Sequence, residues 1–303
     1  MGIGNSAIRL LMREGNRKEF SGKILQLGKQ LVVATEQSIE KLAEEENFKL
    51  SEPRCDIEYG KSQYPGVMAI SDEYLFQRLG FEVVDALDQN TFEGANVIHD
   101  LNHPFDKDFE KIGAYDFIYD GGTIEHIFNI PNALKNVFDL LAMDGRIVHA
   151  TAINAINHGY YNFATFFFEE FYETNGFQIN ENGVVRIPDI SLGDKVLYTS
   201  CGKNSQFAKS VNPSLFDGVV CWTNFIATKT SDSTGDRFPQ QGFYLGTWDP
   251  TSSVEGHGNS GLVHGDSLVK SIYGKLIRVP FLKCIAKYLR DRYANSLVDW
   301  EVI

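Results

Sequence analysis

The most informative segment of the chain for its fold is Tyr115-Asp116-Phe117-Ile118-Tyr119-Asp120-Gly121-Gly122-Thr123-Ile124-Glu125-His126-Ile127. Its first half is an apolar run typical of a strand, and its second half is an acidic, glycine-bearing turn that leads into a helix. Apolar residues at helical spacing follow over 132–141, and a turn at 144–145 leads into a further strand up to residue 150. This order predicts an open parallel α/β sheet, in which ligands bind beyond the carboxyl ends of the strands.

Similar patterns on both sides of this stretch extend the predicted sheet. We expect further strands at 23–28, 81–88, 95–101, 183–187 and 218–227, the last two as an antiparallel closing pair. We expect further helices at 35–46, 71–79 and 166–175, with Thr35 and Ser71 as N-caps and with Gly80 and Gly176 as stops. The strands at 81–88 and 95–101 lead into Asp88 and Asp100, so that polar groups gather at one edge of the sheet.

Composition limits the classes of function. The chain has 303 residues, 43% of them hydrophobic, which is enough for a substantial core. Its net charge of −12 argues against a nucleic-acid partner, because phosphate binding needs clustered Lys and Arg. The four cysteines are far apart and form no CxxC pair, so we expect free thiols. No apolar run reaches the roughly 18 residues of a membrane span, and we expect a cytoplasmic protein.

The chain divides by composition into four parts. Residues 1–20 are an N-terminal lead-in, and residues 21–229 are the α/β domain, with an insertion near 47–70. Residues 230–265 are an irregular loop, rich in Gly, Ser, Thr, Asp and Pro. Residues 266–303 are a basic amphipathic helical tail, in which 270–293 suits docking on protein or on an anionic membrane surface. The sequence also leaves open whether the chain forms a homo-oligomer.

The order of elements, with an acidic turn after the fourth strand and then the pair Glu125-His126, resembles the class I S-adenosylmethionine-dependent methyltransferases of small-molecule type. The resemblance spans residues 22–229 and is clearest over 116–177. It implies a doubly wound, mostly parallel seven-stranded sheet of Rossmann-like type with a C-terminal helical extension. It also implies methyl transfer from S-adenosylmethionine to a hydroxyl or amine of a small molecule, such as a sugar or secondary metabolite. We assign no metal.

The resemblance implies a cofactor site made by residues at the strand ends. By position these residues are Gly28, Asp88, Asp100, Asp120, Gly121 and Gly122. Asp88 matches the acidic residue that holds the ribose hydroxyls, and Asp100 matches the polar residue that faces the adenine. The first glycine loop, residues 26–30, departs from the family because it keeps one glycine and lacks the acidic residue. Two interpretations stay open: a variant loop that still binds cofactor, or a degenerate domain that acts as a catalytically silent scaffold or partner.

The resemblance also places candidate catalytic and acceptor-binding residues. His126 is the candidate general base, because its ordinary pKa lies near neutral pH, and Glu125 is its candidate partner. After the fifth strand, Asn157, His158, Tyr160 and Tyr161 are candidate acceptor-binding residues. Purely structural roles stay open for each of these groups: strand-end turns for the aspartates, a helix start for Glu125 and His126, and a core edge for the tyrosines.

A nicotinamide-dependent oxidoreductase is disfavoured. Such an enzyme normally carries GxGxxG after its first strand, and residues 28–30 do not supply this motif.

Overall fold

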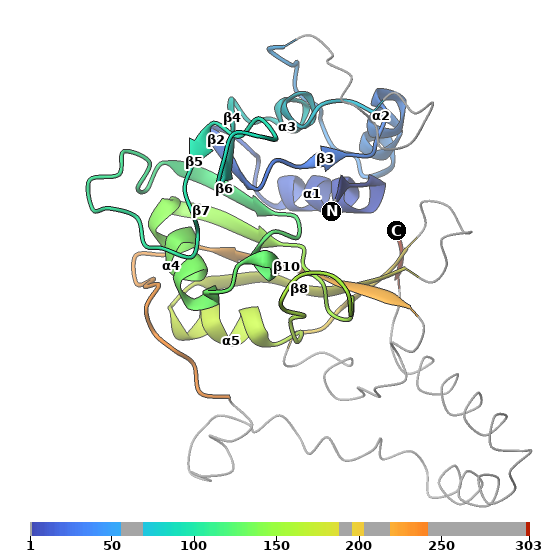
Figure 1. Cartoon of the computed structure of the whole chain (residues 1–303). Coiled ribbons are helices and arrows are strands. Elements are labelled where there is room, and N and C mark those ends of the chain that lie inside the picture. The colour runs from blue at the N-terminus through green and yellow to red at the C-terminus, as the bar shows by residue number, and fades with distance from the viewer. Residues whose placement is uncertain (1, 56–68, 188–195, 203–218, 242–300) are drawn as a thin grey trace, which may run out of the picture.

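The computed structural model describes residues 2–55, 69–187, 196–202, 219–241 and 301–303. These residues form one large sheet with helices packed on both faces (Figure 1). In this described part, no helix is long and apolar enough to cross a membrane. Within it, Cys201 and Cys221 are buried and free of disulfides, as expected.

The large sheet has nine strands among the described residues, in the order β11-β9-β8-β10-β7-β6-β2-β4-β5. Their bounds are β2 Lys23–Leu27, β4 Val83–Asp88, β5 Val97–Ile98, β6 Tyr115–Asp120, β7 Leu141–His149, β8 Gln178–Ile187, β9 Leu197–Ser200, β10 Val220–Thr228 and β11 Glu301–Val302. The five strands β5, β4, β2, β6 and β7 run parallel, and β10 runs antiparallel to both β7 and β8. The predicted α/β class and the predicted antiparallel closing pair are therefore confirmed.

The prediction of a mostly parallel, seven-stranded sheet is wrong in its strand count and in its strand directions. The sheet is mixed, because among the described strands β10, β8, β9 and β11 pair only in antiparallel fashion. Beyond β8 the sheet continues through β9 and then β11, both antiparallel to their neighbours. These strands are short and lie far apart in the sequence, so neither gives a periodic signal of its own. A separate parallel pair, β1 Gly2–Ile3 with β3 Leu31–Val32, was also not predicted.

The helices cover the sheet from both sides. On one face lie α1 Asn5–Arg17, α2 Glu36–Glu45 and α3 Asp72–Leu79, and on the other lie α4 Ile130–Leu140 and α5 Phe167–Thr174 (Figure 1). The predicted caps are present: Thr35 and Ser38 form a capping box, and the Ser71 side chain accepts a hydrogen bond from the Tyr74 backbone. Gly80 and Gly176 both have positive φ where α3 and α5 end.

The alternation of side chains along β6 builds a core on each face. Phe117 and Tyr119 pack with the helices α1 to α3, whereas Ile118 packs with α4 and α5. Residues 5–17, which we expected as part of a lead-in, form a helix whose Ile8 and Leu11 belong to the first of these cores. The expected insertion near 47–70, the loop at 230–265 and the tail at 266–303 lie largely outside the described residues, and residues 301–302 of the tail form strand β11.

The order of the parallel strands contains a switch point. From β2 the chain continues to β4 and β5 on one side, and then returns to β6 and β7 on the other side. The loops after β2 and β6 therefore leave the sheet in opposite directions. In open α/β sheets this is where ligands bind, outside the carboxyl ends of the strands.

Candidate functional site

The structure places Gly28, Asp88 and Asp120 along one edge of the sheet. Leu27 pairs with Asp120 of β6 on one side and with Leu87 of β4 on the other. The Gly28 backbone N–H donates to the Leu87 carbonyl at 2.7 Å. The expected residues from the three neighbouring strand ends are thus adjacent, as the resemblance requires.

The crevice that the switch point predicts between the ends of β2 and β6 is crowded by side chains. Gly28 has a φ of 69°, and a Cβ at this position would lie 2.7 Å from the Thr123 hydroxyl oxygen. That hydroxyl donates to the Leu27 carbonyl and so ties the two strand ends together. The side chain of Gln30 covers Gly121, because a Cβ there would lie 2.3 Å from Gln30 Oε1. Gly122, also buried, has a φ of 91° and allows the turn to bend away.

Gln30 has one unsatisfied polar atom in this crevice. Its amide nitrogen donates to the carbonyls of Leu27 and Gly28 at 2.9 and 3.2 Å. Its Oε1 is buried and makes no hydrogen bond with any residue that the structure describes. A buried acceptor without a partner is costly, so Oε1 would gain one further hydrogen bond if a ligand donor reached it.

Asp88 and Asp100 lie at neighbouring, partly exposed strand ends. Asp88 is the last residue of β4, and its Oδ1 accepts from the Gln89 backbone N–H at 2.6 Å. Its backbone carbonyl accepts from the N–H of His99, next to Asp100. The hydrogen bond from the Asn102 backbone N–H lowers the pKa of Asp100. Both carboxylates are accessible from solvent.

Asp120 is fully buried, and its contacts are those of a structural residue. Its Oδ1 accepts from the backbone N–H groups of Thr123 and Ile124, and its Oδ2 lies 2.7 Å from His149 Nδ1. The other ring nitrogen of His149 lies 2.8 Å from the Tyr172 hydroxyl. These contacts support the turn after β6 and do not favour the expected contact between Asp120 and the cofactor. Sequence reasoning missed His149, although it ends the next strand beside Asp120.

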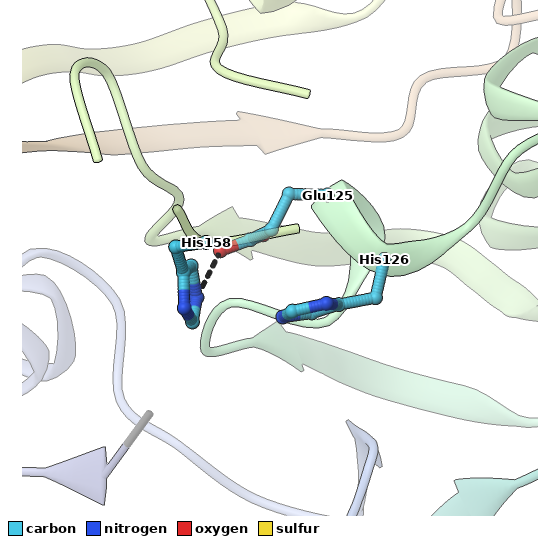
Figure 2. Close-up of side chains that lie close together, drawn as sticks. All are labelled: Glu125, His126 and His158. Carbon is cyan, nitrogen blue, oxygen red and sulfur yellow. Dashed lines mark ion pairs between the residues drawn. The ribbon is translucent and has the colours of Figure 1, made fainter. Parts of the chain in front are cut away.

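Three side chains converge directly after this turn. Glu125 and His126 belong to the short 3-10 helix Ile124–His126, and His158 comes from the loop after β7 (Figure 2). Glu125 Oε1 and His158 Nε2 are 3.3 Å apart, and one ligand atom from each of the three residues lies within 4.8 Å of the others. The two imidazole rings meet edge to face, with centroids 4.7 Å apart. The sequence paired Glu125 with His126; the structure adds His158, which we had assigned to acceptor binding.

The environment shifts the titration of all three groups. Burial, reinforced by the nearby Asp120 carboxylate, raises the pKa of Glu125 to about 8, and the backbone N–H groups of Glu125 and Ala152 oppose this shift only in part. Partial burial and the neighbouring His158 lower the pKa of His126, and partial burial also lowers the pKa of His158. At neutral pH both imidazoles are therefore neutral, and Glu125 is mostly protonated in the metal-free protein.

Gly159 holds the loop that carries His158 against Glu125. Its φ is 69°, and a Cβ there would lie 2.8 Å from the Glu125 carbonyl oxygen. The same carbonyl accepts from the backbone N–H groups of Tyr160 and Tyr161 at 2.8 and 3.2 Å. Asn157 and Tyr160 are exposed on this loop, and Tyr160 packs edge to face on Phe128.

An apolar cavity of about 370 Å³ begins beside this loop. It lies among α4, α5 and residues 161–164, and its lining includes Phe128, Leu134, Tyr161, Phe163 and Phe171. Of the expected acceptor-binding residues, Tyr161 is the one that lines it.

The fold and the site define a doubly wound α/β protein with a Glu–His–His cluster beside its switch point. No family model matches the sequence. No curated protein matches it. Solved structures that resemble it include methyltransferases, among them one described as S-adenosyl-L-methionine-dependent and one in complex with S-adenosyl-L-homocysteine.

Three of these structures illustrate the likeness. The first is a putative S-adenosyl-L-methionine-dependent methyltransferase from Methanococcus maripaludis, with 11% identity, a TM-score of 0.26, and coverage of 48% of this chain and 54% of that one. This chain therefore spans about half the length of that protein. The second is the O-methyltransferase of a trans-AT PKS multienzyme from Brevibacillus brevis, in complex with S-adenosyl-L-homocysteine, with 14% identity, a TM-score of 0.39, and coverage of 76% and 73%. The third is a putative sarcosine dimethylglycine methyltransferase from Galdieria sulphuraria, with 11% identity, a TM-score of 0.38, and coverage of 74% and 86%.

Proposed function

We propose that this protein transfers a methyl group from S-adenosylmethionine to a hydroxyl or amine of a small molecule. The observation that carries the proposal is the position of the Glu125, His126 and His158 cluster. It directly follows β6 at the switch point, next to the glycine end of β2 and two strands from the aspartate end of β4. Ligands bind at this point in open α/β sheets, so a cofactor and titratable side chains share one edge.

The residues at this edge fit the two halves of the cofactor. Asp88 and Asp100 are accessible carboxylates on neighbouring strand ends, and carboxylates suit ribose hydroxyls and an exocyclic amine as acceptors. On the methionyl side, the unpaired Oε1 of Gln30 suits an ammonium donor. Gly28, with its positive φ, keeps a Cβ out of the same crevice.

The cofactor supplies an electrophilic methyl group on a sulfonium. The chain's own residues must then bind the acceptor and take up its proton. His126 is suited to this task, because its lowered pKa keeps the imidazole neutral and able to accept a proton at neutral pH. Glu125 does not orient His126 as a carboxylate would, since its own proton is retained up to a pH of about 8.

The acceptor binds between the His158 loop and the apolar cavity beside it. Tyr161 belongs to both, since its backbone N–H donates to the Glu125 carbonyl and its side chain lines the cavity. The aromatic lining suits a ring or an acyl chain better than a free sugar. A secondary metabolite with an apolar part is therefore the acceptor class that this surface favours.

Titration calorimetry with S-adenosylmethionine and with S-adenosylhomocysteine tests the cofactor assignment without knowledge of the acceptor. We expect the wild-type protein to bind both. Asp88→Ala should weaken binding by at least about 10-fold, equivalent to ~1.4 kcal/mol. Gln30→Leu keeps most of the bulk but removes the acceptor, and should weaken binding by about the same factor.

Asp108→Ala is the matched control, because Asp108 is exposed and does not belong to this edge of the sheet. It should leave both affinities unchanged. If the folded wild-type protein binds neither compound, the proposal fails. The crowding of the crevice by Gln30 and Thr123 would then favour the alternative of a catalytically silent, methyltransferase-like scaffold.

A further inference from the structure

Glu125 is a fully buried side chain without hydrogen bonds of normal geometry. Its exposed fraction is 0%, and neither carboxyl oxygen makes a hydrogen bond of normal geometry within the described residues, although the backbone N–H groups of Glu125 and Ala152 lie close enough to act on its pKa. A buried carboxyl group in this condition is costly to keep. The polar atoms that approach it from the loop after β7 are those of His158, whose Nε2 is also buried and without a hydrogen bond. Two buried polar atoms that face each other at 3.3 Å without a hydrogen bond of normal geometry are placed as two ligands of one ion would be.

The spacing of the three side chains suits a metal ion. Zinc ligands of the nitrogen and oxygen type lie about 2.0–2.2 Å from the ion, so neighbouring ligand atoms in a tetrahedral site are about 3.3–3.5 Å apart. The separation of Glu125 Oε1 from His158 Nε2 is 3.3 Å, which already matches. His126 completes the set within 4.8 Å, and its exposed position at the end of the 3-10 helix leaves room for a small closing movement.

We propose that Glu125, His126 and His158 bind a divalent first-row transition-metal ion, with zinc as the representative ion. Two imidazole nitrogens and one carboxylate oxygen form a donor set of intermediate softness, which suits zinc and its neighbours. Calcium and magnesium prefer all-oxygen sites. In the described part of the chain no fourth His, Cys, Asp or Glu joins the cluster. These three residues fill three positions of a four-coordinate ion and leave the fourth to water or another ligand.

The metal site goes beyond the proposed function and does not depend on it. The ion is bound by this chain alone, without cofactor or acceptor, so its presence is measured separately. If both proposals hold, the open position faces the acceptor side of the loop that carries His158. An acceptor hydroxyl that coordinates there releases its proton to water more readily. His126 is then a ligand to the ion, and the base role given to it above applies to the metal-free protein.

The test is the binding of zinc and cobalt to the full-length protein without an affinity tag, after EDTA has been removed by dialysis. We expect one equivalent of zinc to bind, and cobalt to give visible d–d absorption bands of a low-symmetry site. His158→Ala and Glu125→Gln should each weaken zinc binding by at least about 100-fold. His158→Ala is the safer variant for folding, because its side chain is 33% exposed on a loop.

His103→Ala is the matched control. His103 is an exposed histidine that also lies beside a carboxylate, with its Nε2 3.7 Å from Asp100, but it lies outside the cluster. The His103→Ala variant should bind zinc as tightly as the wild type does. Magnesium should not compete with zinc at millimolar concentration. The proposal is overturned if the wild type binds no zinc, or if His158→Ala and Glu125→Gln bind it as tightly as His103→Ala does.

Discussion

Asp120 illustrates how a residue at a functional edge of the sheet is used for structure. Its carboxylate accepts two backbone N–H groups of the turn and contacts His149, with no exposure to solvent. The sequence shows that an acidic residue ends β6, but it does not show where the carboxylate points. A cofactor-binding role and a structural role would both place an Asp before two glycines. The tertiary contact with His149 distinguishes the structural role from the cofactor-binding one.

Asp120→Asn should destabilise the protein by about 1–3 kcal/mol, because one acceptor oxygen becomes a donor that faces another donor. Urea unfolding at neutral pH measures the change. Asp116→Asn on the same strand is the control, since Asp116 is exposed and accepts from the Lys23 N–H at 2.8 Å. It should cost less than about 1 kcal/mol. Equal effects of the two variants would contradict the structural role of Asp120.

Glu125 makes the stability of the metal-free protein depend on pH. Its pKa rises from an ordinary 4.5 to about 8 in the folded state, so the folded protein keeps a proton that the unfolded chain releases. The stability that this group contributes is complete below pH 4.5 and is lost as the pH rises through about 8. The loss over this window is on the order of a few kcal/mol.

Glu125→Gln should abolish this dependence, because glutamine does not titrate. With EDTA present, the free energy of unfolding of the wild type relative to Glu125→Gln should fall between pH 5 and pH 8. Denaturant unfolding at both pH values provides the measurement. A difference between the two proteins that stays constant across this range would show that Glu125 is not buried as described.

At the scale of elements, local patterns predicted much of the fold. Strand β6, the capped helices α2 and α3, and the closing strands β8 and β10 follow from apolar periodicity, caps and glycine stops. Strands β9 and β11 could not be predicted from local patterns, because each is short and pairs with strands that are distant in the sequence. Likewise, the pair Glu125 and His126 could be selected from its position after β6, whereas the contact between Glu125 and His158 depends on how the loop after β7 folds back.

The loop after β7 depends on Gly159. Gly159→Ala would place a methyl group 2.8 Å from the Glu125 carbonyl and would also strain a backbone with φ of 69°. We expect a loss of about 1 kcal/mol from the backbone alone, and more from the contact. The shift of His158 should also weaken zinc binding by about 10-fold, equivalent to ~1.4 kcal/mol.

Gly113→Ala is the matched control for this prediction. Gly113 has a nearly equal φ of 65°, and a Cβ there would meet no atom within 4 Å. The variant should show the backbone cost without any change in zinc affinity. If both variants bind zinc equally well, the loop that carries His158 is not part of the site.

At the scale of the whole molecule, the order of the strands creates the site. The carboxyl ends of β2, β4 and β6 meet because β2 lies between the other two, and the loop after β7 returns to the same edge. A single sequence can indicate that these strands are parallel. Their order in the sheet, that is, the edge at which each new strand joins, follows from how the elements pack. The nearness of Gln30 to Gly121 is a result of the same packing, and it sets how much of the crevice is free.

A crystal structure of the protein grown with S-adenosylhomocysteine and zinc would show whether this edge of the sheet binds the cofactor. We expect nucleoside density beside Asp88 and Asp100, with its amino-acid end toward Gln30. We also expect an anomalous peak at the zinc edge between Glu125, His126 and His158. Nucleoside density on another surface, or a crevice that stays filled by Gln30 and Thr123 at saturating ligand, would contradict the claim that this edge of the sheet is the functional site.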